Sequence, residues 1–297
     1  MRTIFYFVLC FTLSCSDSLK TLPNSTGSNS EILFVCPDYL WENELSKPVL
    51  DIFSQQIPGI ASKEPAFKLM QVNSKELNSL LKSHTNIIII SSDSLNSFKN
   101  NLWANNQLVT YLNYQNDIKK FNVDCSNIYK IYYDKEISSL RRAMNQKSNS
   151  DYNKLVKARF NIDLIVPEKY TLTDDKADFL QFSYNPQNLD VIKHILIYTY
   201  NGENSNQMSI FKKTNQMLSQ HLLGKSKNSY VVIEDEFPPE TYNGSYRTLW
   251  KLENGFMGGP IIIKPYFNGT DIVLVSALVF DPASTKRQHL KEFEAIL

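Results

Sequence analysis

The spacing of apolar residues changes near residue 160, and this change constrains the fold more than any other feature of the sequence. Before it, apolar runs typical of strands, such as residues 32–36 and 86–91, are separated by helical patterns such as residues 44–55. After it, apolar runs follow one another more closely. Strands separated by helices predict an α/β layer, and adjacent strands with segregated helices predict an antiparallel sheet. We therefore expect a mixed α+β chain, with an α/β domain over residues 31–160 and an antiparallel α+β domain over residues 161–297.

The individual elements follow from the same periodicities. In the first half we expect further strands at residues 67–72 and 107–114, and then a long helical region over about residues 126–160, broken near residue 149. In the second half we expect one amphipathic helix over residues 207–222 and a closing helix. The expected strands there are at residues 164–166, 179–184, 192–200, 230–234, 246–252, 259–267 and 272–280. This order resembles PsbP-like domains, a likeness of fold that implies no function.

The first fifteen residues have the order of a secretory signal. One basic residue, Arg2, precedes the apolar run at residues 4–11, and the small residue Ser14 precedes Cys15. The run is shorter than the ~20 residues that a membrane-spanning helix needs. The segment resembles a lipobox, which implies a signal peptide over residues 1–14 and a lipid on Cys15. The alternative is an ordinary secretory signal with a coincidental cysteine. The polar residues 15–30 are expected to form a flexible tether.

Composition excludes several classes of function. The chain carries 31 basic and 30 acidic residues, a balance that argues against a nucleic-acid-binding protein. Apart from the signal, two cysteines remain, Cys36 and Cys125. An oxidising compartment would permit one disulfide between them. Cys36 ends an apolar run, where a cysteine behaves as a small buried hydrophobe, so we expect free thiols. No CxxC motif is present, and no cofactor is indicated.

The residues that could carry catalysis are scattered along the sequence. His84 and His289 are expected at the surface, His194 on the outward face of a strand, and His221 as a satisfied core histidine. No two of them have the spacing of a metal pair, so no metal site is predicted. Acidic residues cluster at Asp174-Asp175, expected in a turn, and at residues 234–236, expected in a solvated loop.

The richest local feature is the segment from Tyr246 to Pro260. It combines aromatic residues, Met257 and three of the nine glycines. Aromatic residues and methionine are enriched at recognition surfaces, which predicts a binding loop. Glycines inside strands also mark turns and bulges, which predicts a purely structural role with Trp250 in the core. The candidate binding residues are Trp250, Phe256, Met257, Gly258, Gly259 and Pro260.

Several segments resemble a family of Bacteroidota lipoproteins that carry domain of unknown function 4837. The most specific is residues 249–260, with Leu249-Trp250 and Phe256-Met257-Gly258-Gly259-Pro260; weaker matches lie at residues 31–35 with Trp41, 57–59, 86–89 and 293–297. The resemblance extends over nearly the whole mature chain. It implies a lipobox, outer-membrane anchorage and a two-part fold, and it supplies no reaction or catalytic residue. Ser18, in Asp17-Ser18-Leu19, resembles an O-glycosylation site of Bacteroidota envelope proteins.

Two functions of different classes remain open. The first is a non-catalytic, lipid-anchored envelope protein that faces the periplasm and binds a protein or glycan partner. The alternative is a hydrolase of envelope polymers whose carboxylates are brought together only by the fold. An aromatic surface would favour binding, and two neighbouring carboxylates in a cleft would favour hydrolysis.

Overall fold

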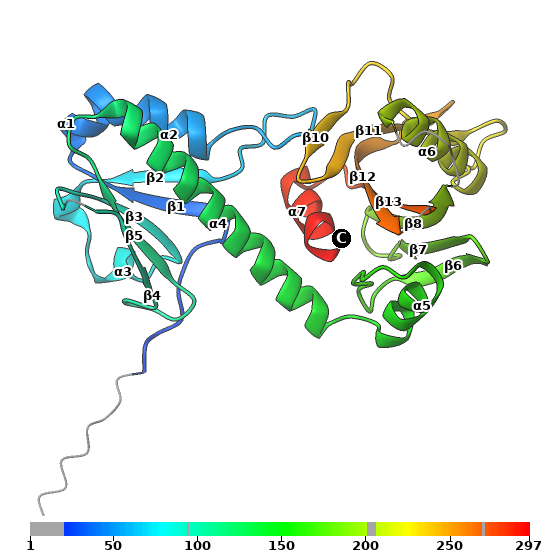
Figure 1. Ribbon diagram of the computed structural model, residues 1–297, viewed down its shortest axis with the longest axis horizontal. Helices are drawn as coiled ribbons and strands as arrows, with labels where there is room; N and C mark the ends of the chain where they lie inside the picture. The colour runs from blue at the N-terminus through cyan, green and yellow to red at the C-terminus, as the bar shows by residue number, and fades with distance from the viewer. Residues whose placement is uncertain (1–20, 94, 201–205, 269–270) are drawn as a thin grey trace, which may run out of the picture.

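The computed structural model describes residues 21–93, 95–200, 206–268 and 271–297, arranged as two lobes (Figure 1). The proposed anchor Cys15 and the proposed modification site Ser18 lie outside these ranges. Each lobe is built on one sheet, and the helices α4 (Ile118–Gln146) and α7 (Lys286–Ile296) lie between the two sheets. Within the described residues, no helix is both long and apolar enough to cross a membrane. The expected mixed α+β fold is confirmed.

The first lobe contains a five-stranded sheet in the order β2-β1-β3-β5-β4. Its neighbouring strands β2 (Lys68–Val72), β1 (Glu31–Val35), β3 (Asn86–Ser91) and β5 (Leu108–Asn113) are parallel. The edge strand β4 (Ser97–Asn100) is antiparallel to β5, and the sequence did not predict it because three of its four residues are polar and most are exposed. The α/β character expected for this half is confirmed.

Helices cover both faces of this sheet. One face packs against α4 and α2 (Ser46–Phe53), which continues from α1 (Asp38–Leu40) through a π-helical turn (Trp41–Leu45). The other face packs against residues near the 3-10 turn (Ser74–Glu76) and the short helix α3 (Ser79–Lys82). The start expected for α4 near residue 126 is wrong: the helix begins at Ile118, because the Asp117 side chain caps it by accepting from the backbone amides of the first turn.

The helical region breaks where the sequence predicts. The second piece, α5 (Ser150–Phe160), is capped by Asn149. It packs against the second sheet, since the rings of Tyr152 and Phe182 lie 5.2 Å apart. The division of the chain at residue 160 stays a prediction, although these contacts associate α5 with the second lobe.

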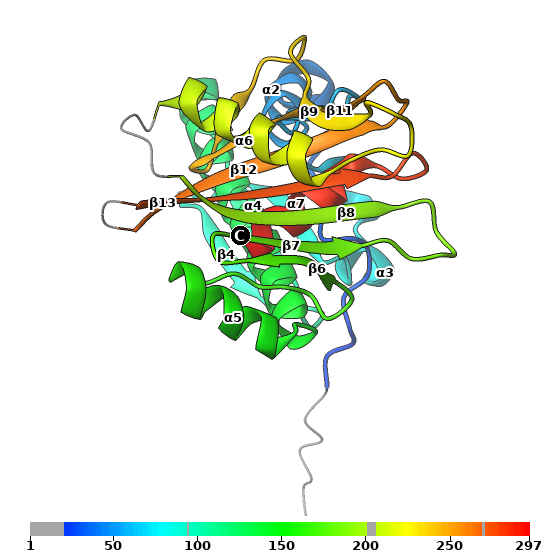
Figure 2. The same ribbon diagram turned by 90° about the vertical axis from the view of Figure 1, so that its right-hand side faces the viewer.

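The second lobe contains an antiparallel sheet in the order β10-β11-β12-β13-β8-β7-β6, with β9 also paired to β11. Its strands are β6 (Thr171–Lys176), β7 (Phe179–Tyr184), β8 (Ile192–Tyr200), β9 (Tyr230–Ile233), β10 (Glu240–Tyr242), β11 (Ser245–Glu253), β12 (Gly258–Asn268) and β13 (Asp271–Phe280). One face packs against α6 (Gln207–His221) and the other against α7 (Figure 2). The antiparallel α+β half is therefore confirmed.

Two local expectations in this lobe are wrong. Residues 164–166 form no strand; their buried backbone is held by the Asn153 side chain, which accepts from the Val166 amide at 2.8 Å, and by α7. Asp174 and Asp175 lie within β6 and not in a turn, because they pair with Gln181 and Leu180 of β7, beyond a register shift between Leu172 and Asp174. These charges and the bulge lie on an edge strand, where they discourage further strand pairing.

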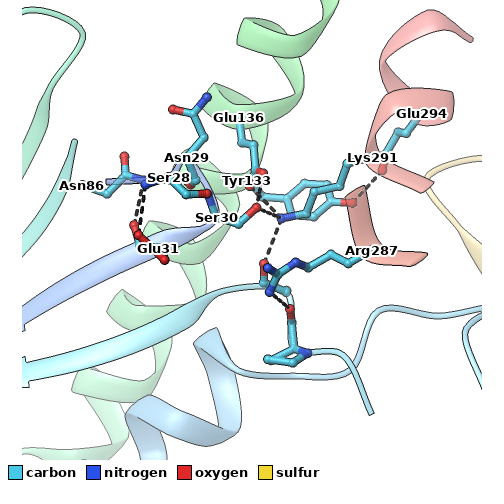
Figure 3. A network of polar contacts seen from close by, with 12 residues as sticks. Ser28, Asn29, Ser30, Glu31, Asn86, Tyr133, Glu136, Arg287, Lys291 and Glu294 are labelled. Atoms are coloured by element: carbon cyan, nitrogen blue, oxygen red, sulfur yellow. Dashed lines mark hydrogen bonds and ion pairs between the residues drawn. The ribbon is translucent and has the colours of Figure 1, made fainter. Parts of the chain in front are cut away.

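A buried polar network joins the two lobes (Figure 3). Lys291 of α7 is fully buried, and its Nζ lies 2.7 Å from Oε2 of Glu136 on α4 and 2.8 Å from the carbonyl oxygen of Ala66. Ser30 donates to the other oxygen of Glu136. Every charge in this cluster therefore has a partner, which is the condition under which buried charges are tolerated.

A second ion pair extends the junction toward β11. Arg247 is fully buried and donates to Oε2 of Glu294 at 2.6 Å, an oxygen that also accepts from the Tyr133 hydroxyl at 2.6 Å. The Arg247 guanidinium lies 4.2 Å from the centre of the Tyr242 ring. Gly59 lies against this arginine with φ of +82°, and a Cβ at Gly59 would be 2.7 Å from the Arg247 Cβ. The turn at residues 57–59 therefore needs a glycine for both conformation and space.

Two further regions bear on the sequence predictions. Cys36 and Cys125 are both buried and free, as expected, and burial raises the pKa of the Cys36 thiol to about 11. Part of the segment expected as a tether is bound to the first lobe: the amide of Thr26 donates to the carbonyl of Ser83 at 2.9 Å, and the carbonyl of Thr26 accepts from Thr85 at 2.8 Å.

Candidate functional site

A cleft of about 580 Å³ lies on the α6 face of the second sheet; we call it the hairpin cleft. Its walls are the end of α6, the loop at residues 223–229 and the turn at residues 254–257 that joins β11 to β12. Its floor comes from β7, β8, β11 and β13. The cleft therefore includes three of the candidate binding residues, Trp250, Phe256 and Met257.

Trp250 forms a buried part of the floor. It lies opposite Gly259 in the β11–β12 pair, and its Nε1 donates to the carbonyl oxygen of Val279 on β13 at 3.2 Å. A Cβ at Gly259 would lie 2.2 Å from that oxygen and 3.4 Å from the indole nitrogen. The indole therefore packs over Gly259, where there is no room for a larger residue. Trp250 therefore lies in the core, as the structural interpretation of the segment from Tyr246 to Pro260 predicts.

The bulge that we expected at Gly258 and Gly259 is absent. The β11–β12 register runs without a shift from Tyr246 opposite Ile263 to Lys251 opposite Gly258, and neither glycine has a positive φ. Both positions need glycine because a neighbouring strand's backbone lies too close for a side chain. A Cβ at Gly258 would lie 2.9 Å from the Trp250 carbonyl oxygen. Pro260, the last candidate, is buried within β12. These three residues shape the hairpin and do not line the cleft.

The rim of the cleft is apolar and exposed. Phe256 is fully exposed and Leu223, across the cleft, is 70% exposed. The turn that carries Phe256 is closed by the Leu252 amide, which donates to the Met257 carbonyl at 2.8 Å, and by Asn254 with φ of 53°. An exposed phenylalanine on a well-defined turn is available to a partner at little conformational cost.

His194 lies on the floor, not on an outward face as predicted. Its strand position pairs with Leu278 of β13 and Ser183 of β7, and these side chains share the α6 face. Its Nδ1 lies 2.8 Å from the Ser183 hydroxyl, which fixes the ring. Burial lowers the pKa of His194 to about 4, so the imidazole is neutral at pH 7.

His221, at the end of α6, is a satisfied core histidine as expected, and it also lines the cleft. Its Nδ1 lies 2.9 Å from Oδ2 of Asp174, and its ring stacks on Phe179 with centroids 3.7 Å apart. Ser229, which the sequence did not single out, is 4% exposed, lines the cleft, and its hydroxyl has no partner among the described residues.

The other two histidines are not at the surface. His84 is 6% exposed because residues 24–27 cover it. His289 is largely buried where α7 meets the loop after β13, and its Nε2 lies 2.8 Å from Oδ2 of Asp281. No group of three or more histidine, cysteine, aspartate or glutamate side chains within the described ranges is placed to hold a metal ion.

The acidic clusters are not brought together. Asp174 and Asp175 lie on β6 at one end of the sheet, whereas Glu234 follows β9 near the other end. Asp175 pairs with Arg159, and Glu234 lies 3.2 Å from Nζ of Lys251. Of the described residues that line the hairpin cleft, none is a carboxylate. The cleft thus offers apolar surface, neutral imidazole, amide and hydroxyl groups, and one lysine, Lys225.

Comparison with known proteins finds two family models, neither of which describes an activity. No curated protein matches the chain. A crystal structure from Bacteroides thetaiotaomicron is similar over 45% of this chain and 42% of that one, with 12% identity and a TM-score of 0.21, which is too low to support an argument about the fold. A model described as a domain of unknown function (DUF8532) matches residues 25–145. One described as a domain of unknown function (DUF4837) matches residues 148–297 and contains the motifs at 249–260 and 293–297. Since this match extends over half of the chain, the protein belongs to the DUF4837 family.

Proposed function

We propose that this protein is a lipid-anchored binding module of the cell envelope, held through Cys15 and facing the periplasm, and that the hairpin cleft recognises a protein or glycan partner. The anchor is supported by the signal-like residues 1–14 and the cysteine that follows them. The recognition role is supported by the cleft. Ser18, close to the anchor in sequence, is the proposed site of O-glycosylation.

One observation carries the recognition role: the exposed Phe256 and Leu223 border a cleft whose polar groups are already oriented. Exposed apolar residues beside a concave apolar surface are characteristic of binding sites. His194 is held by Ser183 and His221 by Asp174, so little ordering is needed when a ligand binds. The buried hydroxyl of Ser229 adds a polar group that a ligand can satisfy.

The hydrogen bond between Ser183 and His194 supports positioning and not nucleophilic catalysis. A catalytic base needs a pKa near the working pH, and that of His194 is lowered to about 4 by burial. A catalytic histidine is also oriented by a third group, whereas the ring of His194 bonds to no described carboxylate. We therefore assign His194 to ligand contact.

Cross-linking pull-down from native membranes tests this role with two matched variants. Phe256→Ala should reduce partner recovery at least about tenfold, the effect of removing an aromatic anchor residue from an interface. Phe267→Ala removes an aromatic side chain that is 70% exposed at the opposite end of β12, and it should leave recovery unchanged. Equal recovery with both variants would contradict the proposal.

A further inference from the structure

A smaller pocket of about 250 Å³ lies on the opposite face of the second sheet, between the end of α4, the turn at residues 167–170 and α7; we call it the junction pocket. Lys193 of β8 lines it, whereas the neighbouring His194 faces the hairpin cleft. Its walls are mainly apolar, from Met144, Pro167, Tyr170, Phe293 and Ile296 among others. The junction pocket is therefore separate from the proposed recognition site.

Tyr170 is the feature that points to a ligand. Its side chain lines the pocket and is 7% exposed. Its hydroxyl makes no hydrogen bond within the described part of the chain and is not among the buried atoms that lack a partner, so it can be reached from the pocket. Burial and the nearby charge of Glu292 raise the pKa of Tyr170, so the hydroxyl stays protonated and can donate. A ligand that satisfies it must present an acceptor.

The charges around the pocket favour an anionic acceptor. Lys193 is already paired, with its Nζ 2.8 Å from Oε2 of Glu292. Burial acts to raise the pKa of Glu292, but His289 and Lys193 lower it to about 2, so the Glu292 carboxylate stays ionised beside Lys193. At the mouth, Lys147 and Lys169 are exposed and form no ion pair with a described residue, and Glu168 is the opposing negative charge. Positive charge therefore exceeds negative charge at the opening.

We propose that the junction pocket binds a small monocarboxylate with an apolar body. The carboxylate accepts the hydrogen bond of Tyr170 and lies toward Lys147 and Lys169, and the apolar body packs against Met144, Phe293 and Ile296. The volume of 250 Å³ is below the range of about 300–1,000 Å³ that is typical of drug-sized ligands. The ligand is therefore a short acyl chain or a single ring, and not a diacyl lipid.

Titration calorimetry of the full mature chain tests this with three probes of equal chain length: octanoate, octanol and octylamine. Octanoate should bind one site, with octanol at least about tenfold weaker, the usual effect of losing a charge-assisted hydrogen bond. Octylamine should not bind detectably, because its ammonium group cannot accept from Tyr170 and is repelled by the lysines. Tyr170→Phe should weaken octanoate binding by about tenfold.

Two further variants separate this site from the hairpin cleft and from a folding defect. Lys169→Gln, at an exposed position, should weaken octanoate binding and remain folded, whereas Phe256→Ala should leave it unchanged. Circular dichroism checks that each variant is folded. The proposal is overturned if octanoate does not bind, if octanol or octylamine binds as tightly, if folded Tyr170→Phe and Lys169→Gln both bind normally, or if Phe256→Ala abolishes binding.

Discussion

Lys291→Met is expected to lower the free energy of unfolding by about 3–5 kcal/mol, the range for breaking a buried ion pair. The substitution keeps most of the side-chain volume but leaves the carboxylate of Glu136, which is 3% exposed, without its cation. It also removes the donor to the Ala66 carbonyl oxygen, which lies 2.8 Å from the lysine Nζ. Because these residues belong to α4, α7 and the chain before β2, the loss weakens the junction between the lobes. Urea unfolding measures the change.

Two controls identify the buried charge as the cause. Lys47→Met breaks an exposed ion pair with Asp51 and should cost at most about 1 kcal/mol. The double variant Lys291→Met, Glu136→Leu replaces both charges by apolar groups, and it should recover most of the lost stability. A loss below about 1 kcal/mol for Lys291→Met, or additive losses in the double variant, would contradict the proposed role of this pair.

Gly259→Ala is expected to cost about 3 kcal/mol, the upper part of the range for overpacking a well-packed core. The new Cβ would be 2.2 Å from the Val279 carbonyl oxygen, a backbone atom fixed in the β12–β13–β8 region of the sheet. To relieve the contact, β12 must move or the Trp250 indole must release that carbonyl. Thermal unfolding gives the loss, and tryptophan fluorescence reports whether Trp250 becomes exposed.

Gly244 provides the matched control. It lies in the turn between β10 and β11 with φ of +69°, and a Cβ there would meet nothing within 4 Å. Asparagine tolerates this backbone region, so Gly244→Asn should change stability by less than about 1 kcal/mol. If Gly259→Ala were as stable as Gly244→Asn, the packing of Trp250 across position 259 would not require a glycine there.

The fold class could be predicted from the sequence because alternation and helical periodicity are local signals. Residues 32–36 and 86–91 are apolar on both faces, as expected for parallel strands between two helical layers. β4 could not be predicted, because an edge strand with the residues Ser-Phe-Lys-Asn lacks an apolar pattern. The early start of α4 is signalled in the sequence by Asp117, because aspartate is a common helix-capping residue.

The candidate site could be predicted only in part. Local composition identified Phe256 and Met257, which line the hairpin cleft, because aromatic residues beside glycines are visible in a single segment. His194 and Ser229 reach the cleft from strands and loops distant in sequence, so their burial depends on tertiary packing. The same holds for Lys291 and His84: α7 docks on α4, and residues 24–27 fold over His84. Their charge and polarity alone favour a surface position.

Site-specific photo-cross-linking tests whether the hairpin cleft recognises an envelope partner. A photoreactive phenylalanine analogue replaces Phe256 in one strain and Phe267 in another, and each is irradiated in intact cells. We expect a discrete adduct from position 256 that is absent from position 267, and that diminishes when Leu223→Ala is added to remove the opposite rim. No adduct from position 256, or the same adduct from both positions, would contradict it.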